Sequence, residues 1–253
     1  MPEARQDDLL RQLLSLGDNA LILSQQLGAL VGHCPVLEEE LANANVCLDL
    51  LGQARLWLSY AAEVEGLGRN EDDLAFLRHA GEFRNVLLVE QPNGSYADTI
   101  ARQYYFDAWH ALQLERLARS GNERIAGIAA KASKEVSYHL QRSSGWVISL
   151  GDGTAESHER MQEALNGLWM FTGELFAPDA SEALAQAGTA PDAPPMRAAW
   201  LEHVKATFAS AGLALPTSTW MQSGGRAGRH TENLGYILAE MQYLHRAFPA
   251  CQW

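Results

Sequence analysis

The stretch from Lys131 to Leu150 restricts the fold of this chain more than any other feature. It contains no proline, and it lies between the turn signals at 120–121 and 151–153, which predicts one helix long enough to cross a helical bundle. Within it, Glu135 and His139 are four residues apart, so the carboxylate and the imidazole share a helix face. A long helix with such a pair raises the question of a metal site inside a bundle.

Prolines and glycines divide the rest of the chain into further helical segments. We expect all nine prolines between helices, because an interior proline loses a hydrogen bond and clashes with the preceding turn. No run alternates with period two for long enough to indicate a strand, so the predicted class is all-α. In addition to the helix that holds the opening stretch, the pattern predicts helices over about 7–31, 36–65, 71–90, 96–119, 156–176, 195–211 and 231–247.

Four of the predicted helices are long and are joined by short turns, which is typical of antiparallel neighbours in a bundle. We expect a single domain over 1–253, with a core bundle over about 7–150 and additional C-terminal helices over about 155–253 packed on it. The two loops richest in proline and glycine, 177–195 and 212–230, lie in that C-terminal part.

Charge and cysteine usage exclude several classes of function. The chain has 31 acidic and 19 basic residues, a net charge of −12, which argues against nucleic acid or an anionic membrane as a partner. Cys34, Cys47 and Cys251 form no CxxC pair, which favours a reducing compartment over a disulfide framework. The first residues lack an apolar signal segment, and no run of 18 apolar residues occurs, so we expect a cytoplasmic protein.

Carboxylates recur near the middle of four consecutive predicted helices. Taken singly, each would be interpreted as part of a solvated face and each nearby histidine as a structural one, but the recurrence favours an inward-facing polar cluster. In the predicted second helix, Asn45 and Asp49 lie close in angle to Leu41 and Leu48, and we expect them to point inward. The cluster then comprises Asp49 in the second helix, Glu82 and Asn85 in the third, Asp107 with His110 in the fourth, and Glu135 with His139 in the fifth.

A two-metal carboxylate bundle needs Glu-x-x-His at i, i+3 on two helices and one carboxylate from each of two others. Here Asn85 offers only a neutral amide three residues after Glu82, and Val136 stands three residues before His139. We therefore predict no metal in this chain. Buried carboxylates without metal need cations, and the hypothesis is that His139 and nearby basic residues fill the space of the metal, the candidates being Arg55, Arg84, Lys131 and Arg142.

The segment from Gly224 to His230 is rich in glycine and arginine. It follows no predicted strand and matches no P-loop, so it gives little support for phosphate binding. It is either a connector before Thr231, which is placed to cap the last helix, or a basic segment that meets an acidic partner or a nucleotide-like tail. The sequence leaves its role open.

Five further segments are distinctive: LGDNALILSQQLG, LANANVCLDLLGQARLWLSYAAE, LLVEQPNGSYADTIARQYYFDAWH, KEVSYHL and TENLGYILAEMQYLHRAFP. Together they resemble the C-subunit family of bacterial ring 1,2-phenylacetyl-CoA epoxidases (phenylacetyl-CoA monooxygenases). The resemblance implies a ferritin-like bundle and a place in a complex that inserts one oxygen atom from O2 into the aromatic ring of phenylacetyl-CoA. It also implies that iron resides in a related A subunit, that NADPH, FAD and a 2Fe-2S cluster serve the reductase, and that the C subunit is a structural partner without its own cofactor.

On this resemblance, no residue of the chain is catalytic and the polar cluster becomes a vestigial metal site. The run Glu82-Phe83-Arg84-Asn85 is a candidate lining for a remnant ligand pocket, and the helices around 41–62 and 97–118 are candidate surfaces for the A subunit or other subunits. Self-association of the lone chain stays open. So do two other classes of function: a ferritin-like module that binds acyl-CoA, and a self-contained iron oxygenase with an altered site. The vestigial site comprises Asp49, Glu82, Asn85, Asp107, Glu135 and His139.

Overall fold

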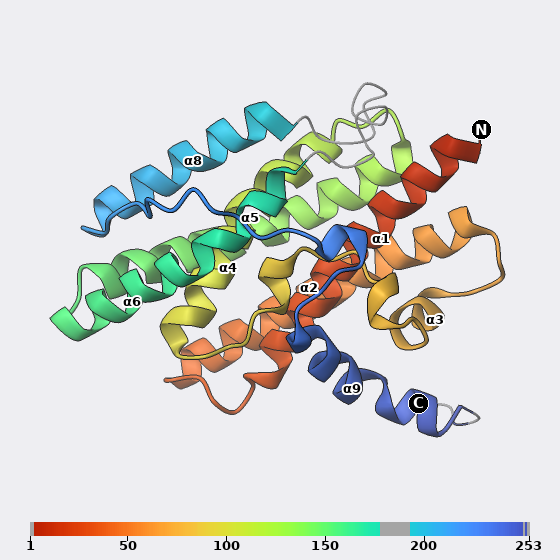
Figure 1. The fold of residues 1–253 in the computed structure, drawn as a ribbon, viewed down its shortest axis with the longest axis horizontal. Helices are drawn as coiled ribbons and strands as arrows, with labels where there is room; N and C mark the ends of the chain where they lie inside the picture. Colours follow the sequence, from red (N-terminus) through yellow and green to blue (C-terminus); the bar gives the residue numbers. More distant parts are fainter. Residues whose placement is uncertain (1–2, 178–192, 250, 252–253) are drawn as a thin grey trace. The chain divides into compact units, whose positions relative to one another are not determined.

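The computed structural model describes residues 3–177, 193–249 and 251. Every regular element among them is a helix, which confirms the all-α class (Figure 1). The chain forms two compact units, Met1–Pro92 with Gly224–Trp253 (unit 1) and Asn93–Ser223 (unit 2). The expectation of a single domain stays a prediction. Among the described helices, none combines the length and the apolar character needed to cross a membrane.

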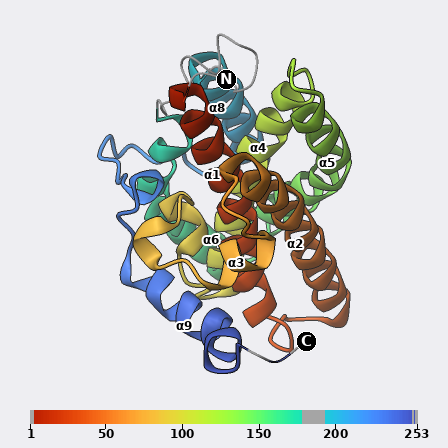
Figure 2. The ribbon, with the colours of Figure 1, turned by 90° about the vertical axis from the view of Figure 1, so that its right-hand side faces the viewer.

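Unit 1 is built on two long helices, α1 (Glu3–Ala29) and α2 (Leu37–Glu65), which run side by side (Figures 1 and 2). Their contact buries leucines of α1, among them Leu13 and Leu23, together with Trp57 of α2. The short connection between them makes the pair antiparallel. Both helices match their predicted ranges closely.

The predicted third helix over 71–90 is wrong. Only α3 (Glu71–Phe76) is α-helical, and two short 3₁₀ turns follow, η1 (Ala80–Glu82) and η2 (Leu87–Glu90), with extended backbone at Phe83 and Val86. We name residues 77–92 the α3–α4 connection.

Polar side chains of α1 hold this connection in its non-helical course. Asp18 accepts a hydrogen bond from the backbone N–H of Arg84 (2.8 Å), and Asn19 accepts one from that of Val86 (2.8 Å). Gln26 donates to two backbone carbonyls at the end of the connection (3.1 and 3.0 Å). These tertiary bonds satisfy backbone groups that a helix would have satisfied itself, so a local helical pattern did not decide the conformation.

A buried ion pair fixes the same region. The side chain of Asp18 pairs with the guanidinium of Arg78, which also donates to the carbonyl of Glu82 (3.2 Å) and lies 4.3 Å from the ring centroid of Phe83. The exposed fractions of the two charged side chains are 2% for Arg78 and 0% for Asp18.

The last helix, α9 (Glu232–Ala247), belongs to unit 1, and its side chains bond to backbone carbonyls at the end of α3. Gln242 donates to the carbonyls of Ala75 and Arg78, both at 3.0 Å. Arg246 donates to the carbonyls of residues 76–78 at 2.9–3.0 Å. Two side chains of α9 thus satisfy carbonyls that the end of α3 leaves without intrahelical partners.

Unit 2 contains α4 (Tyr96–Leu117), α5 (Glu123–Gly151), α6 (Ala155–Leu168) and α8 (Ala193–Ser210). Side-chain caps explain where the two longest begin: Ser95 and Asp98 form a capping box at α4, and the side chain of Asn122 accepts from two backbone N–H groups at the start of α5. The core of this unit holds an aromatic group that includes Tyr105 and Trp200, whose ring centroids are 5.8 Å apart.

Two details of unit 2 differ from prediction. The helix expected over 156–176 ends as α-helix at Leu168 and continues as two 3₁₀ turns, η3 (Trp169–Phe171) and η4 (Gly173–Phe176). Pro194 and Pro195 lie inside the first turn of α8, where a proline is tolerated because the first helical N–H groups have no intrahelical partner. Most of the loop predicted over 177–195, with Pro178 and Pro191, lies outside the described residues.

Candidate functional site

The unit 1 members of the predicted polar cluster do not share a helix face. Glu82 is exposed in η1, where its carboxylate accepts from the backbone N–H of His79 (2.7 Å) and caps the turn. Asn85 is fully buried in the α3–α4 connection, and Asp49 is half-buried on α2. The helical i, i+3 relation between Glu82 and Asn85 therefore does not exist.

The face of α2 that carries Asn45 is exposed, so the expectation that it points inward is wrong. Asn45 itself is exposed, and the exposed fractions of Leu41 and Leu48 are 60% and 63%. We name this surface the α2 leucine face; its members recur at helical spacing and are Leu37, Leu41, Leu48 and Leu51. Contiguous exposed apolar side chains of this kind mark interaction surfaces.

The other candidate interface helix behaves differently. Most side chains of α4 are buried, including all those from Ala97 to His110 apart from Asp98. The predicted interface over 97–118 is therefore wrong for most of its length, because α4 packs against α5, α6 and α8 of its own unit.

Asn85 takes part in a cluster around Glu90, which was not among the predicted site residues. The fully buried carboxylate of Glu90 accepts from the Asn85 side chain (2.9 Å), from His230 Nδ1 (2.8 Å) and from the backbone N–H of Thr231 (2.7 Å). The other ring nitrogen of His230 faces the carbonyl of Phe83 at 3.1 Å. Protein groups thus occupy both oxygens of Glu90, and Asn85 and Phe83 belong to this packed cluster.

The glycine-rich segment 224–230 packs tightly on the α3–α4 connection. A Cβ atom added to Gly225 would lie 2.2 Å from the carbonyl oxygen of Asn85. One added to Gly228, whose φ of 77° also favours glycine, would lie 2.2 Å from the carbonyl oxygen of Gly81. The glycines therefore serve close backbone packing, which favours the connector interpretation. Thr231 stands at the predicted N-cap position of α9, but its side chain makes no capping hydrogen bond.

Replacing Gly225 with alanine is expected to lower the free energy of unfolding by about 1–3 kcal/mol, since the new methyl group overlaps backbone atoms that cannot rotate away. Urea denaturation followed by circular dichroism measures the change. Gly127→Ala is the matched control, because that helical glycine has no atoms near its added Cβ; it should stabilise the chain by about 0.5–1 kcal/mol. Equal stabilities for the two variants would contradict the tight packing.

In unit 2, Asp107 of α4 forms the centre of a second buried cluster. One carboxylate oxygen accepts from the side chain of Gln103 (2.7 Å) and the other from the hydroxyl of Ser143 (2.8 Å). Burial raises the pKa of Asp107 to about 6, although His139, Ser143, Gln103 and Arg142 all oppose the rise. Gln103 and Ser143 were not predicted as members of the cluster. Their spacing, four residues before Asp107 and four after His139, is the signal that identifies them.

The two buried histidines of unit 2 differ in their surroundings. The charge of His139 lowers the pKa of Asp107, whereas His110 packs against Phe106 in a tilted arrangement, with ring centroids 5.0 Å apart. Burial, and to a smaller extent the charge of His139, lowers the pKa of His110 to about 3. His110 is therefore a neutral structural histidine. Glu135 lies on α5, half-buried.

The basic residues proposed to neutralise the cluster divide into two groups. Arg142, with His139, acts on Asp107. Arg55 pairs at the surface with Glu71 (3.2 Å), the guanidinium of Arg84 donates to carbonyls of its own segment, and Lys131 is exposed. Within the described ranges, no group of three or more His, Cys, Asp or Glu side chains is arranged to hold a metal ion. Whether the six predicted residues form one site stays a prediction.

The whole chain, residues 1–253, matches the family model described as "Phenylacetic acid catabolic protein", and the chain belongs to this family of all-α, ferritin-like proteins. It is 54% identical over 241 residues to the C subunit of the 1,2-phenylacetyl-CoA epoxidase of Escherichia coli K12, which covers 95% of this chain and 97% of that protein. It is also 23% identical over 179 residues to the A subunit of the same enzyme, covering 71% of this chain and 57% of that relative.

Proposed function

We propose that this chain is the non-catalytic C-type subunit of a 1,2-phenylacetyl-CoA epoxidase, where it supports an iron-bearing A-type subunit in aerobic phenylacetate degradation. The proposal rests on a difference in sequence identity. The chain is 54% identical to the C subunit along almost its full length, but only 23% identical to the A subunit along part of it.

The two buried clusters agree with a supporting role. Asp107 is satisfied by an amide and a hydroxyl, and Glu90 by an amide, an imidazole and a backbone N–H. Under this proposal iron resides in the A subunit, while the NADPH, FAD and 2Fe-2S chemistry resides in the reductase. Phenylacetyl-CoA is then a substrate of the assembled complex, in the cytoplasm.

The α2 leucine face is the candidate surface for the A subunit. From Leu37 to Leu51 it extends along about 20 Å of helix, at 1.5 Å per residue. Its exposed leucines form an apolar helix face of the kind that packs against another helix, and a helix of the partner would cover it. An A-type subunit of the same family is expected to have long helices that can pack in this way.

Co-expression with the A-type subunit of the same organism tests the proposal. We expect the two chains to co-purify, with iron counted on the A-type chain. Leu48→Glu should abolish co-purification, because it buries a charge in the apolar contact. Leu67→Glu is the matched control: Leu67 is 74% exposed but lies outside the α2 leucine face, so its complex should persist.

Two results would overturn the proposal. If the lone chain bound iron and oxidised substrate after iron loading, it would be a self-contained oxygenase. If it bound phenylacetyl-CoA tightly in a titration and ignored the A-type subunit, it would be an acyl-CoA-binding module.

A further inference from the structure

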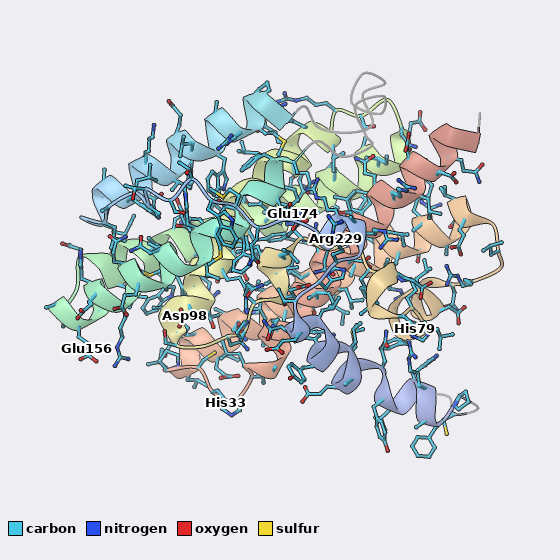
Figure 3. All side chains as sticks on the ribbon, viewed as in Figure 1. His33, His79, Asp98, Glu156, Glu174 and Arg229 are labelled. Carbon is cyan, nitrogen blue, oxygen red and sulfur yellow. The ribbon has the colours of Figure 1, made fainter. Side chains whose placement is uncertain are left out.

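A second surface of unit 1 lies between η1 and α9, away from the α2 leucine face. It is an open groove of about 530 Å³, lined among others by His79, Ala80, Gly235, Ala239, Tyr243 and Arg246. Figure 3 shows His79 beside α9, at the groove. Figure 2 shows α9 and α2 on either side of α3.

Exposed aromatic and apolar side chains lie along α9, with the exposed carboxylate of Glu240 among them. Tyr236 and Tyr243 are 67% and 63% exposed, and Leu244 and the C-cap residue Phe248 are half-exposed. Of these four side chains, Tyr243 is the one that lines the groove. Two small residues of α9, Gly235 and Ala239, are exposed and line the groove. A tyrosine beside exposed small residues is typical of the centre of a protein–protein interface.

The charged residues that line the groove indicate the charge of its partner. Its charged or titratable lining residues are His79 and Arg246, in a chain whose net charge is −12. The carboxylate of Glu82 lies outside this lining, where it accepts from the backbone N–H of His79. The guanidinium of Arg246 is held in place by its bonds to the carbonyls at the end of α3, made through Nε and Nη2. A preorganised donor of this kind binds a carboxylate at little entropic cost.

We propose that this groove docks an acidic amphipathic segment of another member of the epoxidase complex. An Asp or Glu side chain of the segment meets Arg246 and His79, and its apolar side chains pack on Ala239 and Tyr243. The chain thereby has two partner surfaces on unit 1 and bridges two neighbours. This inference rests on the proposed function, because it takes its partner from the same complex.

Site-specific photo-crosslinking in the complete co-expressed complex tests the groove separately from the leucine face. The photoreactive residue p-benzoylphenylalanine replaces Tyr243 in one variant and Leu48 in another, and mass spectrometry identifies the crosslinked peptide. We expect the Tyr243 position to crosslink to an Asp- or Glu-containing segment of a partner protein, and the Leu48 position to a different segment.

Charge substitutions then check the chemistry. His79→Glu and Ala239→Glu each place a carboxylate in the groove and should lower the Tyr243 crosslink yield by about tenfold or more through like-charge repulsion. Ala199→Glu, an exposed alanine on α8 of unit 2, should leave the yield unchanged. Circular dichroism confirms that all three variants fold.

Each other outcome has a definite meaning. A Leu48 crosslink without a Tyr243 crosslink overturns the groove proposal and leaves the proposed function standing. So does a Tyr243 crosslink to a second copy of this chain, or to a peptide without acidic residues. Failure of both crosslinks together with failure of co-purification overturns the proposed function as well.

Discussion

Asp18→Asn is expected to lower the free energy of unfolding by about 3–5 kcal/mol, because it leaves the Arg78 guanidinium buried without its counter-charge. Both side chains are almost completely inaccessible to solvent, so water cannot replace the lost carboxylate. The same substitution weakens the acceptor for the backbone N–H of Arg84, which holds the α3–α4 connection against α1. Urea denaturation, followed by far-ultraviolet circular dichroism, measures the loss.

The surface pair Arg55–Glu71 is the control, because its arginine is 76% exposed and its loss through Glu71→Gln should cost no more than about 1 kcal/mol. The double variant Asp18→Leu with Arg78→Met should be more stable than Asp18→Asn alone, since it removes both buried charges. If Asp18→Asn and Glu71→Gln had the same effect, the assignment of Asp18–Arg78 as a stabilising buried ion pair would be refuted.

The sequence predicted those helices whose ends carry local signals. The capping residues Ser95 and Asn122 and the position of Thr231 mark where α4, α5 and α9 begin, and these helices lie close to their predicted ranges. The prediction failed over 77–92, where the decisive bonds come from Asp18, Asn19 and Gln26 on α1. Partners so far apart in the chain leave no trace in a local periodicity.

The candidate site shows the same division. Asp107 and His139 are buried, in agreement with the inward position that the recurrence of carboxylates on consecutive helices predicted. The sequence could not show that Glu90 and His230, separated by 140 positions, pair with each other. Nor could it show the exposure of Leu41 and Leu48, because leucine on a helix ordinarily indicates the core.

The contributions of Asp107 and His110 to the free energy of unfolding change in opposite directions with pH. The pKa of Asp107 is raised from 3.8 to about 6, so its folded form holds a proton that the unfolded form has lost, and its stabilising contribution disappears as the pH rises from about 4 to 6. The pKa of His110 is lowered from 6.5 to about 3, so its contribution is present above 6.5 and is lost as the pH falls towards 3. Between about pH 4 and 6 the two slopes nearly cancel.

Removing one group at a time should therefore expose the slope of the other. Asp107→Asn, whose amide can accept from Gln103 and donate to Ser143, is expected to lose about 1.4 kcal/mol per unit as the pH falls from 6 to 4. His110→Gln is expected to lose about the same per unit as the pH rises over that range. Urea denaturation at closely spaced pH values measures both slopes relative to the unsubstituted chain, whose other titrating groups cancel in the difference. Parallel curves for the two variants would show that these buried groups keep the same protonation in the folded and unfolded states, contrary to the burial that shifts their pKa values.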